Sequence, residues 1–141
     1  MRALGQATLE EIDGDRWGPA PGDASSLVRS VHTLRTVPLA QLGPEGLRVL
    51  VGQRIGLDVV VPMAVGMLGQ DPFVAGDLFP GDLLSAVLRA PDEWFSAHPA
   101  VAEAMRTIVA AVDEDATDEY GLHLVDDTDL PELLAAWRSP S

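Results

Sequence analysis

Residues 98–112 read HPAVAEAMRTIVAAV, and this stretch decides the fold. Apolar residues recur three, four, seven, eight and eleven positions after Val101, which is the spacing of one face of an α-helix. These residues are Val101, Ala104, Met105, Ile108, Val109 and Val112. His98-Pro99 stands at the predicted helix start, where we expect the histidine to cap or pack. The stretch predicts an amphipathic helix with one face in a core.

The segment before this helix has the same period. Asp82 is a good N-cap for a helix that ends at Pro91. Four residues of that helix are expected to face inward: Leu83, Leu84, Val87 and Leu88. A short turn over residues 92–97 then carries Trp94 and Phe95. Two neighbouring helices are therefore predicted between residues 82 and 112.

Residues 57–68 are apolar on every side, which predicts an element at the buried centre. The run Val59-Val60-Val61 also fits a strand. Pro62 donates no hydrogen bond to a sheet and argues against a central strand. A helix is therefore the favoured interpretation.

Two further helices are predicted upstream. Pro44 begins one of them and Gly56 ends it in the left-handed conformation. The other starts after Asp23 or Ser25 and ends before Pro38. Its apolar stripe is Leu27, Val28, Val31 and Leu34.

Successive helices with short connections predict an all-α fold, a compact single-domain helical bundle of about five to seven helices. We divide the chain into three parts. Residues 1–22 are an irregular lead-in with Trp17 as its apolar anchor, and residues 23–112 are the helical domain. Residues 113–141 are an acidic C-terminal extension, in which a short helix is expected over 130–137 with Asp129 as its cap.

The chain has a net charge of −13, and all nine of its basic residues are arginine. A direct nucleic-acid binder needs a basic surface, so this class is excluded. The charge is −3 over residues 1–23, −2 over 24–112 and −8 over 113–141. An acidic tail is more often a solvated segment than a binding site, and both interpretations stay open.

No catalytic signature emerges from the sequence. The absence of lysine and cysteine excludes Schiff-base chemistry, Walker-A loops, thiolate nucleophiles and disulfides. The acidic run from Asp113 fails the EF-hand pattern, because Asp118 stands where glycine is required. Arg29, His32 and Arg35 share one polar helix face, for which a solvated face is favoured over a phosphate cluster. We expect no enzyme activity, no metal and no cofactor.

The chain is also expected to be cytoplasmic. Acidic residues occur as early as Glu10, and the first residues contain no apolar run. Both observations argue against a signal peptide. The longest apolar stretch, residues 55–68, is shorter than the roughly 20 residues that a spanning helix needs.

A set of motifs spans about residues 8–112. Its most specific parts are Gly52-Gln53-x-x-Gly56-Leu57 and Gly76-Asp77-x-x-Pro80-Gly81-Asp82-Leu83-Leu84. The other segments are Thr8-Leu9-Glu10-Glu11, Trp17-Gly18-Pro19, Leu27-Val28, His32-x-Leu34-Arg35-x-x-Pro38-Leu39, Leu47-Arg48-x-Leu50, Val61-Pro62-x-Ala64, Asp71-Pro72, Trp94 and His98-Pro99. In these motifs the chain resembles a known family, the immunity proteins of bacterial contact-dependent growth inhibition (CDI) systems.

This resemblance implies a helical, non-enzymatic, cytoplasmic antitoxin. Such a protein binds and neutralises the C-terminal toxin domain of a large surface protein delivered by a neighbouring cell. That toxin is often a nuclease, including RNases that attack tRNA. An acidic inhibitor complements a basic nuclease cleft and speeds association. The alternative is an acidic adaptor, or an orphan immunity homologue without a paired toxin.

The partner-binding candidates combine acidic groups with aromatic side chains. The first set is Asp77, Asp82 and Glu93, with Phe79 and Trp94. The second set comes from the extension and is Asp113, Glu114, Asp115, Asp126 and Asp127. If the extension steers association, deleting residues 113–141 should slow binding and flatten its salt dependence.

Overall fold

The computed structural model describes residues 4–113, 115–116 and 129–138. These residues form eight α-helices, two short 3-10 helices and no strand, which confirms the all-α prediction. In chain order the elements are η1 (Leu4–Gln6), α1 (Leu9–Asp13), α2 (Ser26–Leu34), η2 (Leu39–Gln41), α3 (Gly43–Gly52), α4 (Leu57–Gln70), α5 (Asp82–Leu88), α6 (Asp92–Ala97), α7 (Pro99–Ala111) and α8 (Leu130–Arg138). No described helix has the length and apolarity to cross a bilayer.

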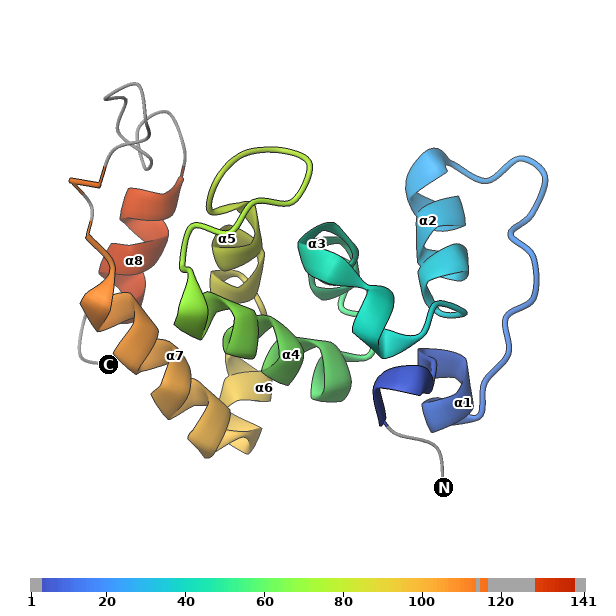
Figure 1. Ribbon diagram of the computed structural model, residues 1–141, viewed down its shortest axis with the longest axis horizontal. Helices are drawn as coiled ribbons and strands as arrows, with labels where there is room; N and C mark the ends of the chain where they lie inside the picture. The colour runs from blue at the N-terminus through green and yellow to red at the C-terminus, as the bar shows by residue number, and fades with distance from the viewer. Residues whose placement is uncertain (1–3, 114, 117–128, 139–141) are drawn as a thin grey trace.

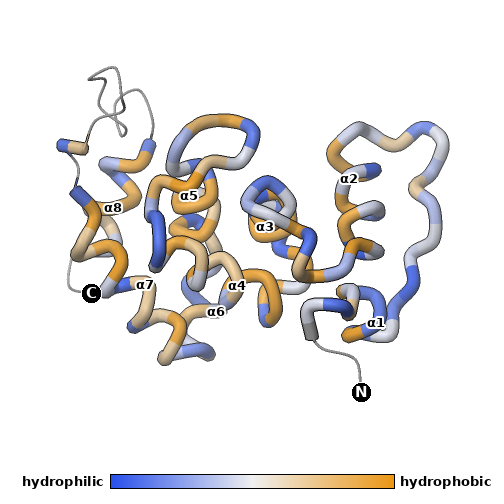
Figure 2. The backbone as a smooth tube through the Cα atoms, viewed as in Figure 1, coloured by the Kyte–Doolittle hydropathy of each residue, from blue (hydrophilic) through white to orange (hydrophobic). Residues whose placement is uncertain are grey.

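The helices are arranged along the long axis of the molecule. Figure 1 shows α1 and α2 at one end, α7 and α8 at the other, and α3, α4 and α5 between them. Figure 2 shows hydrophobic residues throughout this middle region and also in α2, α7 and α8. The side chains that are 0 % exposed there are Leu47, Leu50, Val60, Val61, Ala64, Leu68, Leu83, Leu84 and Val87. Each large side chain buried in this way contributes about 1.5–3 kcal/mol to folding.

The segment expected to be irregular contains the short helix α1. Thr8 caps this helix by accepting the backbone N–H of Glu11 at 3.2 Å. Gly14 ends it at a φ of 72°. Leu9 is buried and lies against Gly56, where an added Cβ would be 2.9 Å from a Leu9 methyl carbon. Five residues are too few to show a helical period, which explains why the sequence pattern missed α1.

Helix α4 confirms the helical interpretation of residues 57–68. Gly56 was expected to end the preceding helix, but α3 ends at Gly52, and Gly56 is the left-handed N-cap of α4 at a φ of 63°. The buried residues lie on one side and are Val60, Val61, Ala64, Val65 and Leu68. Pro62 lies inside the helix on the opposite, exposed side. The element therefore lies at the buried centre as predicted, although one of its faces reaches solvent.

The C-terminal helix α8 packs on α5 and α7. Leu130 and Leu134 are 0 % exposed. The indole N–H of Trp137 donates to the carbonyl oxygen of Leu88 at 3.1 Å, and its ring meets that of Phe95 edge to face. The helix beyond the acidic run is thus part of the hydrophobic core.

Candidate partner-binding surface

The loop that joins α4 to α5 is built around the side chain of Asp82. Its carboxylate accepts the backbone N–H groups of Gly76 at 2.7 Å and Leu78 at 3.0 Å. Asp82 is 2 % exposed. A buried carboxylate is costly unless hydrogen bonds satisfy it, so these donors fix the loop and the carboxylate together. Asp82 therefore holds the loop from within and is not offered to a partner.

The N-cap prediction for Asp82 is also wrong. Gly81 occupies the N-cap position of α5 with a φ of 91°, and Asp82 lies in the first helical turn. A Cβ on Gly81 would lie 2.8 Å from a methyl carbon of Leu130 in α8. Backbone conformation and packing both require glycine here. The local sequence reveals neither the hydrogen bonds of the Asp82 carboxylate nor the packing of Gly81, because the contacting residues lie in the loop and in α8.

Helix α3 braces the same loop through Glu45. Arg48 donates to both carboxylate oxygens of Glu45 at 2.6 Å, and the N–H of Asp77 donates to one of them at 2.9 Å. The hydrogen bond from Arg48 lowers the pKa of Glu45. A Cβ on Gly76 would come within 2.6 Å of a Glu45 oxygen. The residues of the 76–84 motif thus serve the internal structure of the loop.

The tip of the loop presents an acid and an apolar group. Asp77 is exposed, and Leu78 is 62 % exposed, the largest value among the described large hydrophobic residues. Phe79 is half-buried and lines a cavity of about 370 Å³ beside Arg54 and Arg89. The sequence pattern singled out Asp77 and Phe79 but missed Leu78, because an apolar residue in a loop carries no exposure signal.

Glu93 and Trp94 lie away from this loop, at the opposite end of α5 (Figure 1). Glu93 is exposed on α6. Trp94 is half-buried, donates its indole N–H to Asp58 at 2.8 Å and stacks on His98 at 3.9 Å between ring centroids. The first set of binding candidates is therefore divided between two places on the protein.

The acidic extension is only partly described. Asp113 and Asp115 are exposed, and Asp113 accepts the backbone N–H of Asp115 at 2.9 Å. The other three candidates lie outside the described residues and are Glu114, Asp126 and Asp127.

Polar contacts also fasten the start of α8 to α5. Asp129 accepts the hydroxyl of Ser85 at 3.2 Å and forms an ion pair with Arg89. The acidic run is therefore followed by a docked helix and not by a free end. The sequence identified Asp129 only as a local cap, because the partner residues are about 40 positions away.

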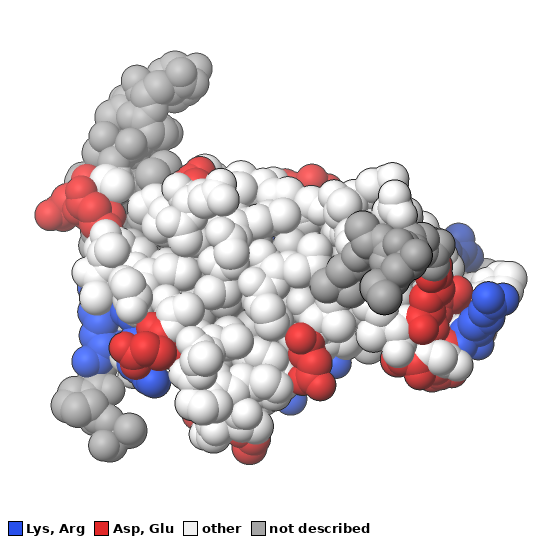
Figure 3. All heavy atoms as spheres, turned by 60° about the horizontal axis from the view of Figure 1, so that its bottom comes forward, with Lys and Arg blue, Asp and Glu red and all other residues white. Residues whose placement is uncertain are grey.

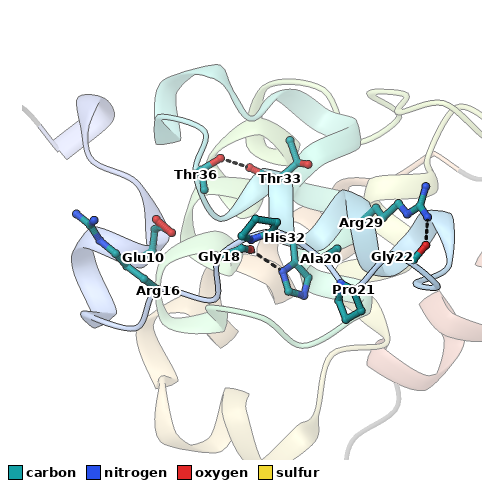
Figure 4. A pocket seen from close by; sticks show the side chains of 11 residues that line it. Glu10, Arg16, Gly18, Ala20, Pro21, Gly22, Arg29, His32, Thr33 and Thr36 are labelled. Carbon is teal, nitrogen blue, oxygen red and sulfur yellow. Dashed lines mark hydrogen bonds between the residues drawn. The ribbon is translucent and has the colours of Figure 1, made fainter.

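A groove of about 670 Å³ lies between residues 16–22 and α2 (Figure 4). His32 Nδ1 lies 3.0 Å from the carbonyl oxygen of Gly18, and Arg29 donates to that of Gly22 at 2.8 Å. In Figure 4 both side chains reach from the helix to this segment. They attach an otherwise exposed segment to the fold.

Arg35 completes this attachment from inside. It is 3 % exposed and donates to both carboxylate oxygens of Asp13 at 2.8 and 3.0 Å. This hydrogen bond lowers the pKa of Asp13. The guanidinium also lies 4.4 Å from the ring centroid of Trp17. The prediction of a solvated face is wrong for Arg35, because local spacing did not reveal a partner 22 residues away.

Comparison with known proteins bears on this arrangement. A comparison with curated proteins finds none that matches the chain. The family model of CDI immunity proteins matches residues 11–105. That range runs from α1 into α7 and includes the loop braced by Asp82 and Glu45. The chain belongs to the family of CDI immunity proteins.

Proposed function

We propose that this protein binds and neutralises the C-terminal toxin domain of a CDI system, acting in the cytoplasm by binding and not by catalysis. The observation that carries the proposal is the family match over residues 11–105, about two thirds of the chain. Neutralisation by binding requires a complementary surface and no reaction chemistry.

We further propose that the toxin is a basic nuclease, with an RNase acting on tRNA as the first candidate. The support is the net charge of −13. Opposite charge on two partners raises the association rate toward roughly 10⁸–10⁹ M⁻¹s⁻¹ at low salt. Fast capture protects the cell when each free toxin molecule destroys many RNA molecules.

The proposed steering residues are exposed acidic side chains. Asp77 and Glu93 are included, whereas Asp82 is not, because its carboxylate is buried. The extension contributes the larger share of charge through Asp113, Glu114, Asp115, Asp126 and Asp127. These charges are expected to act on the association rate more than on the lifetime of the complex.

Co-expression tests the proposal. The toxin probe is the C-terminal domain of any large secreted protein that is found to be encoded beside this gene. Cells that express this domain should stop growing, and cells that also express the present protein should grow. A toxin domain from a non-matching system is the specificity control. Failure of the folded, expressed protein to protect would overturn the immunity function for this pair.

A biochemical assay separates the nuclease from other toxins. The purified toxin domain is incubated with tRNA, with and without an equimolar amount of this protein. Cleavage that disappears on addition of the protein supports the proposed RNase. Intact tRNA with the toxin alone, together with growth protection in cells, would contradict the RNase while leaving immunity in place.

The test of electrostatic steering has to leave helix α8 in place. Deleting residues 113–141 would remove Leu130 and Leu134 from the core, and the result would report folding instead of steering. A better variant keeps the chain length and changes the five proposed steering residues of the extension to Asn or Gln. We expect slower association and weaker salt dependence, with an unchanged dissociation rate.

A further inference from the structure

Helix α4 exposes a face without charge. Its solvent-accessible residues between Asp58 and Gln70 are Val59, Pro62, Met63, Gly66, Met67 and Gly69. A helix that is hydrophobic on all sides is normally buried on all sides. The described residues bury the opposite side of α4 completely, whereas Val59, Met63 and Met67 are half-buried at the edge of the core and Pro62, Gly66 and Gly69 are exposed. In the part of the chain that the structure describes, this side of α4 is therefore an apolar surface that is only partly covered.

Helix α7, which packs beside α4, extends the same surface. Its row of uncharged residues is Val101, Ala104, Ile108 and Ala111. Its other side borders α6 and α8, where Ala102 and Arg106 line a separate cavity. We call the two sets of uncharged residues on α4 and α7 the α4–α7 face.

Carboxylates stand around this face. Asp58 and Asp71 flank the two ends of α4, and the Asp58 side chain is 79 % exposed. Glu103 is 71 % exposed on α7, and Asp113 follows the end of that helix. Figure 3 shows a broad area without charged groups, with acidic groups and some arginines at its margins. Among the arginines near this face, Arg106 forms an ion pair with Glu103 at 3.1 Å.

We propose that the α4–α7 face is the apolar centre of the interface with the toxin domain. This inference rests on the proposed immunity function and names the surface that performs it. Tight interfaces combine an apolar centre depleted of charge with a polar rim, and methionine is enriched in such centres. Met63 and Met67 adapt to an irregular partner surface, and Gly66 permits close approach.

The carboxylates around the α4–α7 face indicate which kind of partner binds there. A second copy on a two-fold axis would place the same acidic rim against itself. Like charges brought together in this way oppose association. A toxin domain with an apolar patch inside a basic rim matches the α4–α7 face in both respects.

Arginine substitutions on the face test the proposal. Gly66→Arg is suitable because nothing lies within 4 Å of an added Cβ, so the free protein accommodates the side chain. Ala104→Arg tests α7. The matched control is Ala110→Arg, also exposed on α7 but about 120° away around the helix axis. Circular dichroism and thermal unfolding should show that all three variants fold as the wild type does.

Binding is measured by surface plasmon resonance with the toxin domain described above. The wild type is measured first, because absence of wild-type binding would refute the proposed function itself. Given wild-type binding, Gly66→Arg and Ala104→Arg should each weaken affinity at least about thirtyfold, mainly through faster dissociation. Ala110→Arg should stay within about threefold, as expected for a charge outside the interface centre.

Two results would overturn the inference. Wild-type affinity in folded Gly66→Arg and Ala104→Arg would show that the toxin binds elsewhere. A wild-type dimer in sedimentation that Gly66→Arg converts to monomer would show that a second copy occupies the face. Either result leaves the immunity function standing, because growth protection by the wild type tests that function separately.

Discussion

The loop of residues 71–81 and the α4–α7 face use their residues in opposite ways. The loop carries the most specific motif of the chain, and the buried Asp82 and Glu45 of α3 hydrogen-bond its backbone from within. The face carries neither of the two most specific motifs and has no charged side chain between Asp58 and Gln70 on α4. One region is specified by its internal contacts, and the other is only partly covered by the described residues.

The residues that identify the family are therefore different from the residues that we propose to bind the toxin. Gly76, Gly81 and Asp82 build a particular loop, so their pattern indicates the fold. A match to the motif therefore supports membership of the family and says little about which toxin is bound.

The largest effect is expected from Asp82→Ala. Removing the carboxylate leaves the backbone N–H groups of Gly76 and Leu78 without their acceptor, at a cost of about 2–4 kcal/mol in unfolding free energy. Urea denaturation measures this loss. Asp77→Ala, on the same loop but exposed, is the control and should cost less than about 0.5 kcal/mol. Equal stability of the two variants would remove the structural role assigned to Asp82.

Two glycine substitutions should have effects of opposite sign. Gly81→Ala should destabilise by about 1–3 kcal/mol, because φ is 91° and the new Cβ would press on Leu130. Gly66→Ala on the α4–α7 face should stabilise by about 0.5–1 kcal/mol, because it lies inside a helix with open space above it. Thermal unfolding of both variants measures the contrast, and a shared sign would contradict it.

Lowering the pH should destabilise the loop of residues 71–81 before it affects the α4–α7 face. Since Arg48 lowers the pKa of Glu45 in the folded state below the ordinary value of 4.5, the carboxylate stabilises the fold above that value. This stability is lost as pH falls from about 4.5 through the lowered pKa. Glu45→Gln, which should cost less than about 1 kcal/mol at neutral pH, should make the decline in stability below pH 4.5 shallower. An unchanged slope in urea titrations at several pH values would refute this assignment.

The smallest effect is expected from Asp77→Asn. The variant should keep its stability and its complex lifetime, and it should associate about two- to threefold more slowly at low salt. Stopped-flow mixing at several salt concentrations measures the rate. A large increase in the dissociation rate would show that the loop tip lies at the centre of the interface and not at its rim. That result would contradict the contrast drawn between the loop and the α4–α7 face.

Much of the helical architecture follows from local sequence. The spacing of Leu83, Leu84, Val87 and Leu88 predicted the buried side of α5, and all four are buried. The period after Val101 predicted α7, although Ala102 is buried in place of Ala104. A repeated apolar spacing is a strong signal, because only one face of a helix meets the core.

Long-range contacts were beyond the same patterns. Arg35 meets Asp13 across 22 residues, and Ser85 meets Asp129 across 44. The local preference of aspartate for N-caps suggested the wrong role for Asp82, since a loop folded back to use the carboxylate. The apolar sequence of α4 predicted its place at the buried centre but not which side reaches solvent, because that depends on the positions of the neighbouring helices.

The methyl groups of methionine give the most direct test of the central claim. Met63 and Met67 lie on the α4–α7 face, whereas Met105 is 0 % exposed in the core and serves as an internal control. In protein labelled with ¹³C at the methionine methyl groups, the NMR signals are compared before and after addition of the toxin domain. The account predicts that the Met63 and Met67 signals shift or broaden strongly while that of Met105 stays near its free position. A formed complex in which Met63 and Met67 keep their free positions would contradict it.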